Sequence, residues 1–259
     1  MRDEFTKFWL EENRGLEKLV LAGNGRIVSH HGKLEAYFHL FNLKDCTLLI
    51  PFPDASVHEY ATFASSPKEP THRWPIDDVQ FLVAGQTHFA FLNDGKVYTW
   101  GDERYDACLG RGAGSDKLTP ADEPGLVTHL VDLPTGPICK IVAGGYASAA
   151  LTRGQDLYVW GGRGNQDSLL SDISGDPIPL DLHGYDVSDA AIGDHHMMVL
   201  TTEQTIWTIG EGVNGQLGLG QECQSSREWR QVAVNLRGRE IVSVAAGPKS
   251  SFLLVRVIA

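Results

Sequence analysis

The sequence has few cysteines, and none of them is closely spaced. Its four cysteines, Cys46, Cys108, Cys139 and Cys223, are scattered along 259 residues without a C-x-x-C pair. Zinc ribbons and thioredoxin-type sites use such close pairs, because two thiolates must reach one metal ion or one another. The spacing therefore gives no recognisable disulfide framework and predicts reduced thiols.

Long hydrophobic runs are also absent. No segment approaches the ~18 consecutive apolar residues that mark a transmembrane helix, although 42% of the residues are hydrophobic. The first residues, MRDEFTKFWLEENRG, lack the basic stretch followed by an apolar stretch that defines a secretory signal. We therefore expect an intracellular protein of the nucleus or cytoplasm, with no membrane partner.

Positive charge is scarce. The chain has 22 lysines and arginines against 33 aspartates and glutamates, which gives a net charge of -11. This balance disfavours direct binding to nucleic acid, because phosphate backbones are bound by clustered basic residues. One local basic patch is a candidate exception, formed by Arg227, Arg230, Arg237 and Arg239. The acidic surface suits basic protein partners better.

Motifs for nucleotide and acyl chemistry are missing as well. The stretch GEGVNGQLGLG (210–220) holds five glycines, but no Walker lysine follows it at the required offset. No G-x-S-x-G nucleophile elbow is present. The pairs in GDHH (193–196) and SHHG (29–32) place two histidines side by side, and neighbouring side chains on a strand point to opposite faces. We therefore expect no enzymatic activity, no cofactor, no metal and no small-molecule substrate.

What the chain does contain is an internal repeat of about 50 residues. Gly85, Gly144, Gly193 and Gly247 mark equivalent points, at intervals of 59, 49 and 54 residues. A second landmark falls in the same phase at Trp100, Trp160 and Ile209, and a third at Gly101, Gly161 and Gly210. Agreement between three landmarks indicates one structural unit repeated along the chain.

Each unit predicts about four short strands. HFAFL and KVYTW are separated by a turn containing NDG, and the next copy has RGQD at the same place. Such a small sheet cannot bury both faces alone, so successive copies must stack on one another. We therefore predict an all-β fold, a β-propeller of about five four-stranded blades that is incomplete or degenerate at the N-terminus.

The repeat resembles that of the regulator of chromosome condensation family, the RCC1-repeat and β-lactamase-inhibitor protein II propellers. The resemblance rests on VAGG-x-x-S-x-A-L, on LYVWG, and on NGQLGLG, and it covers about Val79 to Val257. The chain would be a short, divergent member. The family histidine is matched by His88 and His196, whereas Ala147 and Ser250 occupy the other two places.

The resemblance implies structural roles for a set of repeat positions. The family turn N-x-x-G-Q-L-G is matched once; ERYDACLGRG stands in its place in the first copy, and RGNQDSLLSD in the second. The structural repeat positions are Gly85, His88, Trp100, Gly101, Gly144, Gly145, Trp160, Gly161, Gly193, His196, Gly210, Gly215, Gly218, Gly220 and Gly247. Of these, the marker glycines would allow close backbone approach, and the tryptophans would pack between blades.

We divide the chain into residues 1–78 and residues 79–259. The first part would hold one or two degenerate blades, a short N-terminal helix, and a proline-rich loop, SSPKEPTHRWP (65–75); the second holds the regular repeats. Phe5, Phe8 and Trp9 have helical spacing. Their helix either packs on the propeller or docks into a groove of a partner.

Two functions remain open at this point. The first is a non-enzymatic protein-interaction platform, for which the resemblance implies chromatin, ubiquitin-pathway or GTPase-related partners. The second is guanine-nucleotide exchange on a Ran-type GTPase, for which SDISGDP (171–177) or GSDKLTPADEP (114–124) would supply an acidic wedge. A propeller hydrolase would gather metal ligands near the axis; its candidates, which do not agree in register, are Asp102, Glu103, Asp194 and Glu211.

Overall fold

The structure, a computed structural model, describes most of the chain from residue 72 onward and three shorter segments before it. The described residues are 18–21, 27–30, 56–60, 72–76, 78–112, 119–163, 173 and 175–258. Phe5, Phe8 and Trp9 lie outside these residues. No helix among the described residues is long and apolar enough to cross a membrane.

The strands form five antiparallel sheets, which follow one another in chain order and which we call blades 1 to 5. Blade 1 contains β1 (Lys18–Leu21), β2 (Ile27–His30), β3 (Val57–Tyr60) and β4 (His72–Trp74). Blade 2 contains β5 (Val79–Ala84), β6 (His88–Asn93), β7 (Lys96–Gly101) and β8 (Gly125–Leu126). Blade 3 contains β9 (Ile138–Gly144), β10 (Ala147–Thr152), β11 (Leu157–Gly161) and β12 (Ile178–Pro179). Blade 4 contains β13 (Val187–Ile192), β14 (His196–Thr201), β15 (Ile206–Glu211) and β16 (Ser225–Val232), and blade 5 contains β17 (Arg239–Gly247) and β18 (Ser250–Val257).

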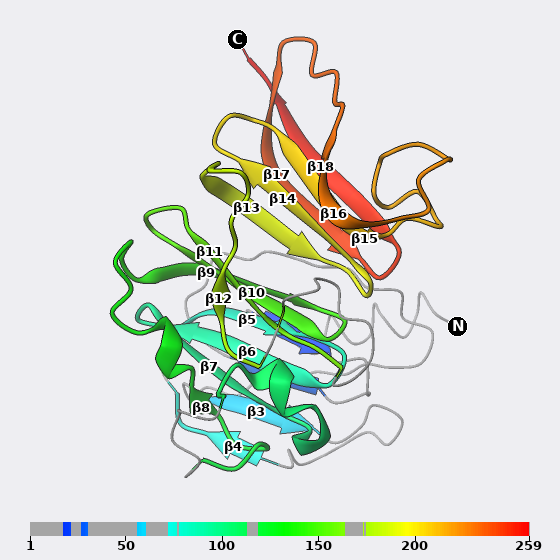
Figure 1. Cartoon of the computed structure of the whole chain (residues 1–259). Helices are drawn as coiled ribbons and strands as arrows, with labels where there is room; N and C mark the ends of the chain where they lie inside the picture. Colours follow the sequence, from blue (N-terminus) through cyan, green and yellow to red (C-terminus); the bar gives the residue numbers. More distant parts are fainter. Residues whose placement is uncertain are drawn as a thin grey trace, which may run out of the picture.

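The first strand of each blade lies beside the first strand of the next, so that these strands form the inner side of the propeller. Contacts run from β1 to β5, to β9, to β13 and to β17. Figure 1 shows the blades stacked in sequence, with β3 and β4 at one end and β17 and β18 at the opposite end. Two 3-10 helices, η1 (Glu103–Leu109) and η2 (Thr128–Leu130), lie in the connections around β8. The predicted propeller of about five blades is confirmed, and blade 5 has two strands in the described part of the chain.

Tight turns set the register inside each blade. Between β6 and β7, Asp94 and Gly95 both have positive φ, at 46° and 72°. Two consecutive left-handed residues match the right-handed twist of the flanking strands, so His88 pairs with Gly101 and Asn93 with Lys96. The NDG sequence thus forms the hairpin that its composition predicts.

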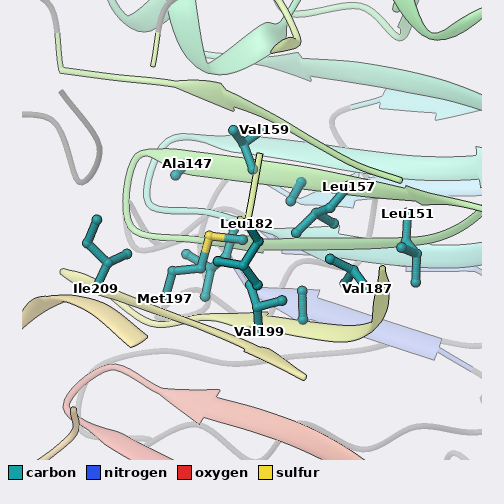
Figure 2. Packing of buried hydrophobic residues seen from close by; sticks show 12 residues of the cluster. Ala147, Leu151, Leu157, Val159, Leu182, Val187, Met197, Val199 and Ile209 are labelled. Atoms are coloured by element: carbon teal, nitrogen blue, oxygen red, sulfur yellow. The ribbon is translucent and has the colours of Figure 1, made fainter. Parts of the chain in front are cut away.

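The hydrophobic core lies between the blades. Figure 2 shows the junction of blades 3 and 4, where Val159 and Leu157 of β11 face Met197 and Val199 of β14, with Leu182 between them. Every residue of β10 and of β14 is buried. Because β6, β10 and β14 are covered by neighbouring blades, stability comes from stacking rather than from any one sheet.

One segment differs from the sequence prediction. His72–Trp74, which fall in the proline-rich segment predicted as a loop, form strand β4 and pair with β3. Pairing is possible because the prolines Pro67, Pro70 and Pro75 all flank these three residues. A short outer strand needs few backbone donors, so prolines outside its ends do not prevent its pairing with β3.

Truncation of Trp160 should destabilise the junction between blades 2 and 3. Trp160 is fully buried, packs in the cluster that contains Leu92 and Ile141, and donates from Nε1 to the carbonyl oxygen of Cys108 at 3.1 Å. We expect Trp160→Ala to lower the free energy of unfolding by roughly 3–5 kcal/mol in urea titrations followed by circular dichroism. The exposed Val213→Ala is the matched control, and equal stability of the two variants would contradict this packing.

Candidate protein-interaction surface

The marker glycines make room for histidine rings and for the next blade. A Cβ atom at Gly85 would overlap Cε1 of His88, and one at Gly193 would overlap Cε1 of His196. The same two Cβ atoms would come within 3.0 Å of the carbonyl oxygens of Gly145 and Gly247, in the blades that follow. Glycine is therefore required at these two positions by close approach, both to the ring and to neighbouring backbone.

Two of the four described junctions contain a hydrogen bond between a buried histidine and a serine. Nε2 of His88 lies 2.6 Å from Oγ of Ser148, and Nε2 of His196 lies 3.0 Å from Oγ of Ser251. Ser251 donates its own proton to the carbonyl oxygen of Gln216 at 2.7 Å. It must therefore accept from His196, which places the imidazole proton on Nε2.

The junction of blades 3 and 4 has a different pair. Ala147 begins β10 where His88 and His196 begin their strands, and Met197 stands where Ser148 and Ser251 stand in their own blades. Both Ala147 and Met197 belong to the apolar cluster between these blades. A junction without histidine is thus packed entirely with hydrophobic side chains at this point.

The other repeat glycines lie against the backbone of the following blade or against a turn of their own blade. A Cβ at Gly144 would overlap the carbonyl oxygen of Ile192, and one at Gly145, where φ is 50°, would overlap that of Asp194. Gly101 and Gly161 would meet the carbonyl oxygens of Thr87 and Tyr146 in the same way. Gly210 has a φ of 108°, which side-chain-bearing residues rarely adopt.

Tryptophans at the second landmark donate to the preceding blade. Nε1 of Trp100 donates to Oε2 of Glu59 at 2.8 Å, and both side chains are buried. Trp160 donates to Cys108, as described above, whereas Ile209 at the equivalent place is buried without a polar group. Each tryptophan therefore joins apolar packing to one hydrogen bond across a junction.

The glycine-rich turn of blade 4 has a structural equivalent in blade 2. Gly215, Gly218 and Gly220 all have positive φ, and Oγ1 of Thr208 donates to the carbonyl oxygen of buried Leu217 at 3.0 Å. In blade 2, Oγ1 of Thr99 donates to the carbonyl oxygen of buried Leu109 at 2.5 Å. The segment ERYDACLGRG thus makes the same contact, although its sequence matches poorly.

Sequence reasoning missed a second set of contacts, at the other ends of the strands. The amide of Ile138 donates to the carbonyl oxygen of Gly95 at 3.3 Å, and that of Val187 donates to Gln155 at 2.9 Å. In blade 5, the amide of Ile241 donates instead to Oε1 of Gln204 at 2.6 Å. The acceptors share a signal that could have found them, a hairpin residue with positive φ.

A buried carboxylate also links the inner strands of blades 3, 4 and 5. Asp189 forms an ion pair with Lys140 on one side and accepts from Ser243 Oγ at 2.6 Å and from the amide of Val244 at 3.0 Å on the other. Asp189 is 5% exposed. The amide of Ala190 also donates to it, at 2.7 Å, and such a carboxylate is retained in the interior because four donors satisfy it.

The candidate metal-binding carboxylates are not brought together as a site. Asp102 caps η1 by accepting from the amide of Arg104, and it also forms an ion pair with the Arg104 side chain. Glu103 and Glu211 are exposed and Asp194 is half-buried. Among the described residues, no group of three or more histidine, cysteine, aspartate or glutamate side chains is placed to hold a metal ion.

The two acidic segments considered as a wedge for nucleotide exchange make different contacts in their described parts. In GSDKLTPADEP, Nη2 of Arg111 donates to the carbonyl oxygens of Pro120 and Ala121 at 3.2 and 3.3 Å. Gly101 also donates to Ala121 at 2.7 Å. These bonds hold residues 120 and 121 against blade 2. In SDISGDP, Asp176 lies 3.7 Å from Nδ1 of His129.

The loop face, where the first strands end, carries an ordered row of arginine and tyrosine side chains. Arg104 lies over the ring of Tyr105 at 5.8 Å, and Arg163 lies over the ring of Tyr146 at 5.0 Å. The two tyrosine rings are 5.3 Å apart. The row Arg104, Tyr105, Tyr146 and Arg163, here called the Arg-Tyr row, spans blades 2 and 3.

The Arg-Tyr row rests on a well-fixed base. The thiol of Cys108 donates to the carbonyl oxygens of Tyr146 and Gly162 at 3.3 and 3.4 Å. Burial raises the pKa of this thiol to about 11, so it is a neutral donor and not a nucleophile at neutral pH. Both arginines are exposed and both tyrosines are half-buried. Tyrosine and arginine held in this way are typical of protein-binding surfaces.

Comparison with known proteins gives one matching family and several relatives. Residues 94–151 and 203–254 match the family model described as the regulator of chromosome condensation (RCC1) repeat. The chain is similar to the mitochondrial RCC1 domain-containing protein RUG3 of Arabidopsis thaliana, with 29% identity over 75% of this chain and 43% of that protein. It is 33% identical to human E3 ubiquitin-protein ligase HERC2 over 70% of this chain and 4% of that protein. It is 31% identical to the Arabidopsis thaliana ultraviolet-B receptor UVR8 over 67% of this chain and 38% of that protein.

Solved structures share the fold. Prp20p of Saccharomyces cerevisiae superposes with a TM-score of 0.64 and 15% identity, over 93% of this chain and 56% of that one. Human WBSCR16 superposes with a TM-score of 0.63 and 16% identity, over 93% and 75% of the two chains. The chain thus spans less than half the length of the curated relatives above.

The buried histidine should make stability depend on pH. Burial lowers the pKa of His88 to about 4, so the folded protein keeps this ring neutral while the unfolded chain binds a proton below about pH 6.5. Between these values the unfolded state holds more protons, so stability falls as pH falls. Relative to His88→Gln, the wild type should lose about 2 kcal/mol between pH 6.5 and pH 5 in urea titrations. Parallel pH profiles of the two proteins would contradict a buried neutral ring.

Proposed function

Since this chain is a β-propeller built from repeats of the regulator of chromosome condensation type, we propose that it is a non-enzymatic platform that binds another protein. The Arg-Tyr row is the observation that carries the proposal. Its rings and guanidinium groups lie against one another, and Asp102 also holds the guanidinium of Arg104, so little side-chain freedom remains to be lost on binding. Chromatin, ubiquitin-pathway and GTPase-related proteins are the partner classes to test.

The row also has the geometry of a small anchoring surface. It draws side chains from η1, from the turn between β9 and β10, and from the residues after β11. Tyr105 departs from helical geometry inside η1, with φ of -126° and ψ of 45°, and this kink accompanies its contact with Tyr146. Two blades therefore have to be correctly stacked before the surface exists, which couples binding to the folded propeller.

Loss of the row should reduce partner binding without unfolding the protein. We expect the double variant Tyr146→Ala, Arg163→Ala to capture at least tenfold less partner protein than the wild type does. The measurement is affinity purification from the protein's own cells, with the captured partner quantified by mass spectrometry. Tyr185→Ala is the matched control, because Tyr185 is also exposed but precedes the first strand of blade 4, at the other end of the strands. Thermal unfolding of each variant checks the fold.

The same experiment separates the platform from nucleotide exchange. A platform retains its partner equally with and without guanine nucleotide. A GTPase that is held most tightly without nucleotide, and released by adding it, would instead support exchange on a Ran-type GTPase. Unchanged capture by the double variant, with loss of capture by Tyr185→Ala, would move the binding surface to the opposite face.

A further inference from the structure

The outer strand of blade 5 is exposed, although it occupies the same place as three buried strands. β18 follows the repeat glycine and turn as β6, β10 and β14 do, and these three are almost entirely buried. In β18, Phe252 is 59% exposed, Leu254 62% and Val257 70%. In the described part of the chain, β18 pairs with β17 alone.

The composition of β18 is typical of a buried strand. Its sequence, SSFLLVRV, has five large apolar side chains in eight residues, and only Leu253 packs in the cluster shared with blade 4. Contiguous apolar surface of this kind, beside an open strand edge, marks an interaction site or an aggregation site. In blades 2, 3 and 4, the strands equivalent to β18 pair with a third strand, β7, β11 or β15.

The backbone of β18 offers a defined set of donors to a third strand. In blades 2 and 4, the repeat glycine donates to the first residue of the second strand, at 2.9 and 2.8 Å. Gly247 and Ser250 are paired at the same place in blade 5. Since backbone groups alternate between the two edges of a strand, Phe252 and Leu254 bond to β17. The amides of Leu253 and Val255 then point to the open edge.

Charge around β18 is opposite to that of the rest of the chain. Residues 225–258 contain two of the 33 acidic residues, Glu228 and Glu240, but six of the 22 basic ones: Arg227, Arg230, Arg237, Arg239, Lys249 and Arg256. Glu240 is already paired with Arg256 across the two strands. β16 and β18 both contribute to the cluster between blades 4 and 5, through Val232 and Leu253.

We propose that β18 binds an extended segment of a partner protein as a third strand, and that this segment alternates aliphatic and acidic residues. Backbone pairing with the edge supplies register, the aliphatic side chains cover the exposed apolar face, and the acidic side chains meet the basic residues of β16 to β18. The proposal deepens the platform function but uses a surface other than the Arg-Tyr row. A second copy of the chain fits less well, because the basic residues of its own 225–258 segment would face those of the first copy.

A synthetic peptide tests this edge with the full chain. The probe is a fluorescein-labelled ten-residue peptide of alternating glutamate and valine, measured by fluorescence anisotropy at low and at physiological salt. We expect it to bind at least tenfold more tightly than the same peptide with lysine for glutamate. A peptide with alternate backbone N-methyl groups should also lose at least tenfold, because it cannot pair with the edge.

Hydrogen exchange measured by NMR locates the bound peptide. The amides of Leu253 and Val255 should become protected on binding, whereas those of Phe252 and Leu254 should be protected beforehand. Val255→Pro removes one edge donor at an edge position that tolerates proline, and should weaken binding at least tenfold, with Val213→Ala as its control. If Val255→Pro does not fold, protection of the Leu253 and Val255 amides in the wild type still tests whether the peptide pairs with β18.

The outcomes also separate this proposal from the platform proposal. The Tyr146→Ala, Arg163→Ala variant should bind the peptide as the wild type does. Equal binding of the lysine peptide, or no added protection at Leu253 and Val255, would overturn the strand proposal and leave the Arg-Tyr row to be judged by partner capture. Protection of these amides without peptide, together with a concentration-dependent dimer mass, would overturn it in favour of a second copy.

Discussion

The structure depends on one constraint, which is that a four-stranded sheet cannot bury two apolar faces by itself. Each blade therefore buries its second strand only when a neighbour covers it, as β10 is covered between blades 2 and 4. The histidine-serine bonds, the tryptophan donors and the carboxylate of Asp189 all act across junctions rather than within blades. Surfaces that span two blades, including the Arg-Tyr row, exist only because this stacking is satisfied.

The sequence predicts the repeat well because the repeat is set by local sterics. Gly85 and Gly193 are required by the rings of His88 and His196, so these pairs recur together and are visible in one chain. Trp100 and Trp160 likewise mark one place in successive blades. The bonds across the junctions are harder to find. Ser148 and Ser251 each stand four residues after a marker glycine, but they lie in other repeats than the histidines that they meet, and Glu59 precedes the regular repeats.

The candidate interaction surfaces were less accessible to sequence reasoning than the fold. The Arg-Tyr row joins Tyr105 to Tyr146 and Arg163, from loops of different blades, and no periodicity links their positions. ERYDACLGRG lacks most of the family turn, yet Leu109 and Thr99 reproduce its contact, since one buried leucine and one carbonyl acceptor suffice. The exposed state of β18 was hidden for the opposite reason, because its composition is that of a buried strand.

The alternation of junction types has a consequence for how such a chain can grow or shrink during evolution. His88 meets Ser148, Ala147 meets Met197, and His196 meets Ser251, so each blade is matched to a specific neighbour. Deleting blade 3 would set the imidazole of His88 against the thioether of Met197, a poor hydrogen-bond partner, and leave Nε2 of His88 buried and unsatisfied. Loss of blades 3 and 4 together would instead set His88 against Ser251, so in this part of the chain a pair of blades can be lost while the junction stays matched.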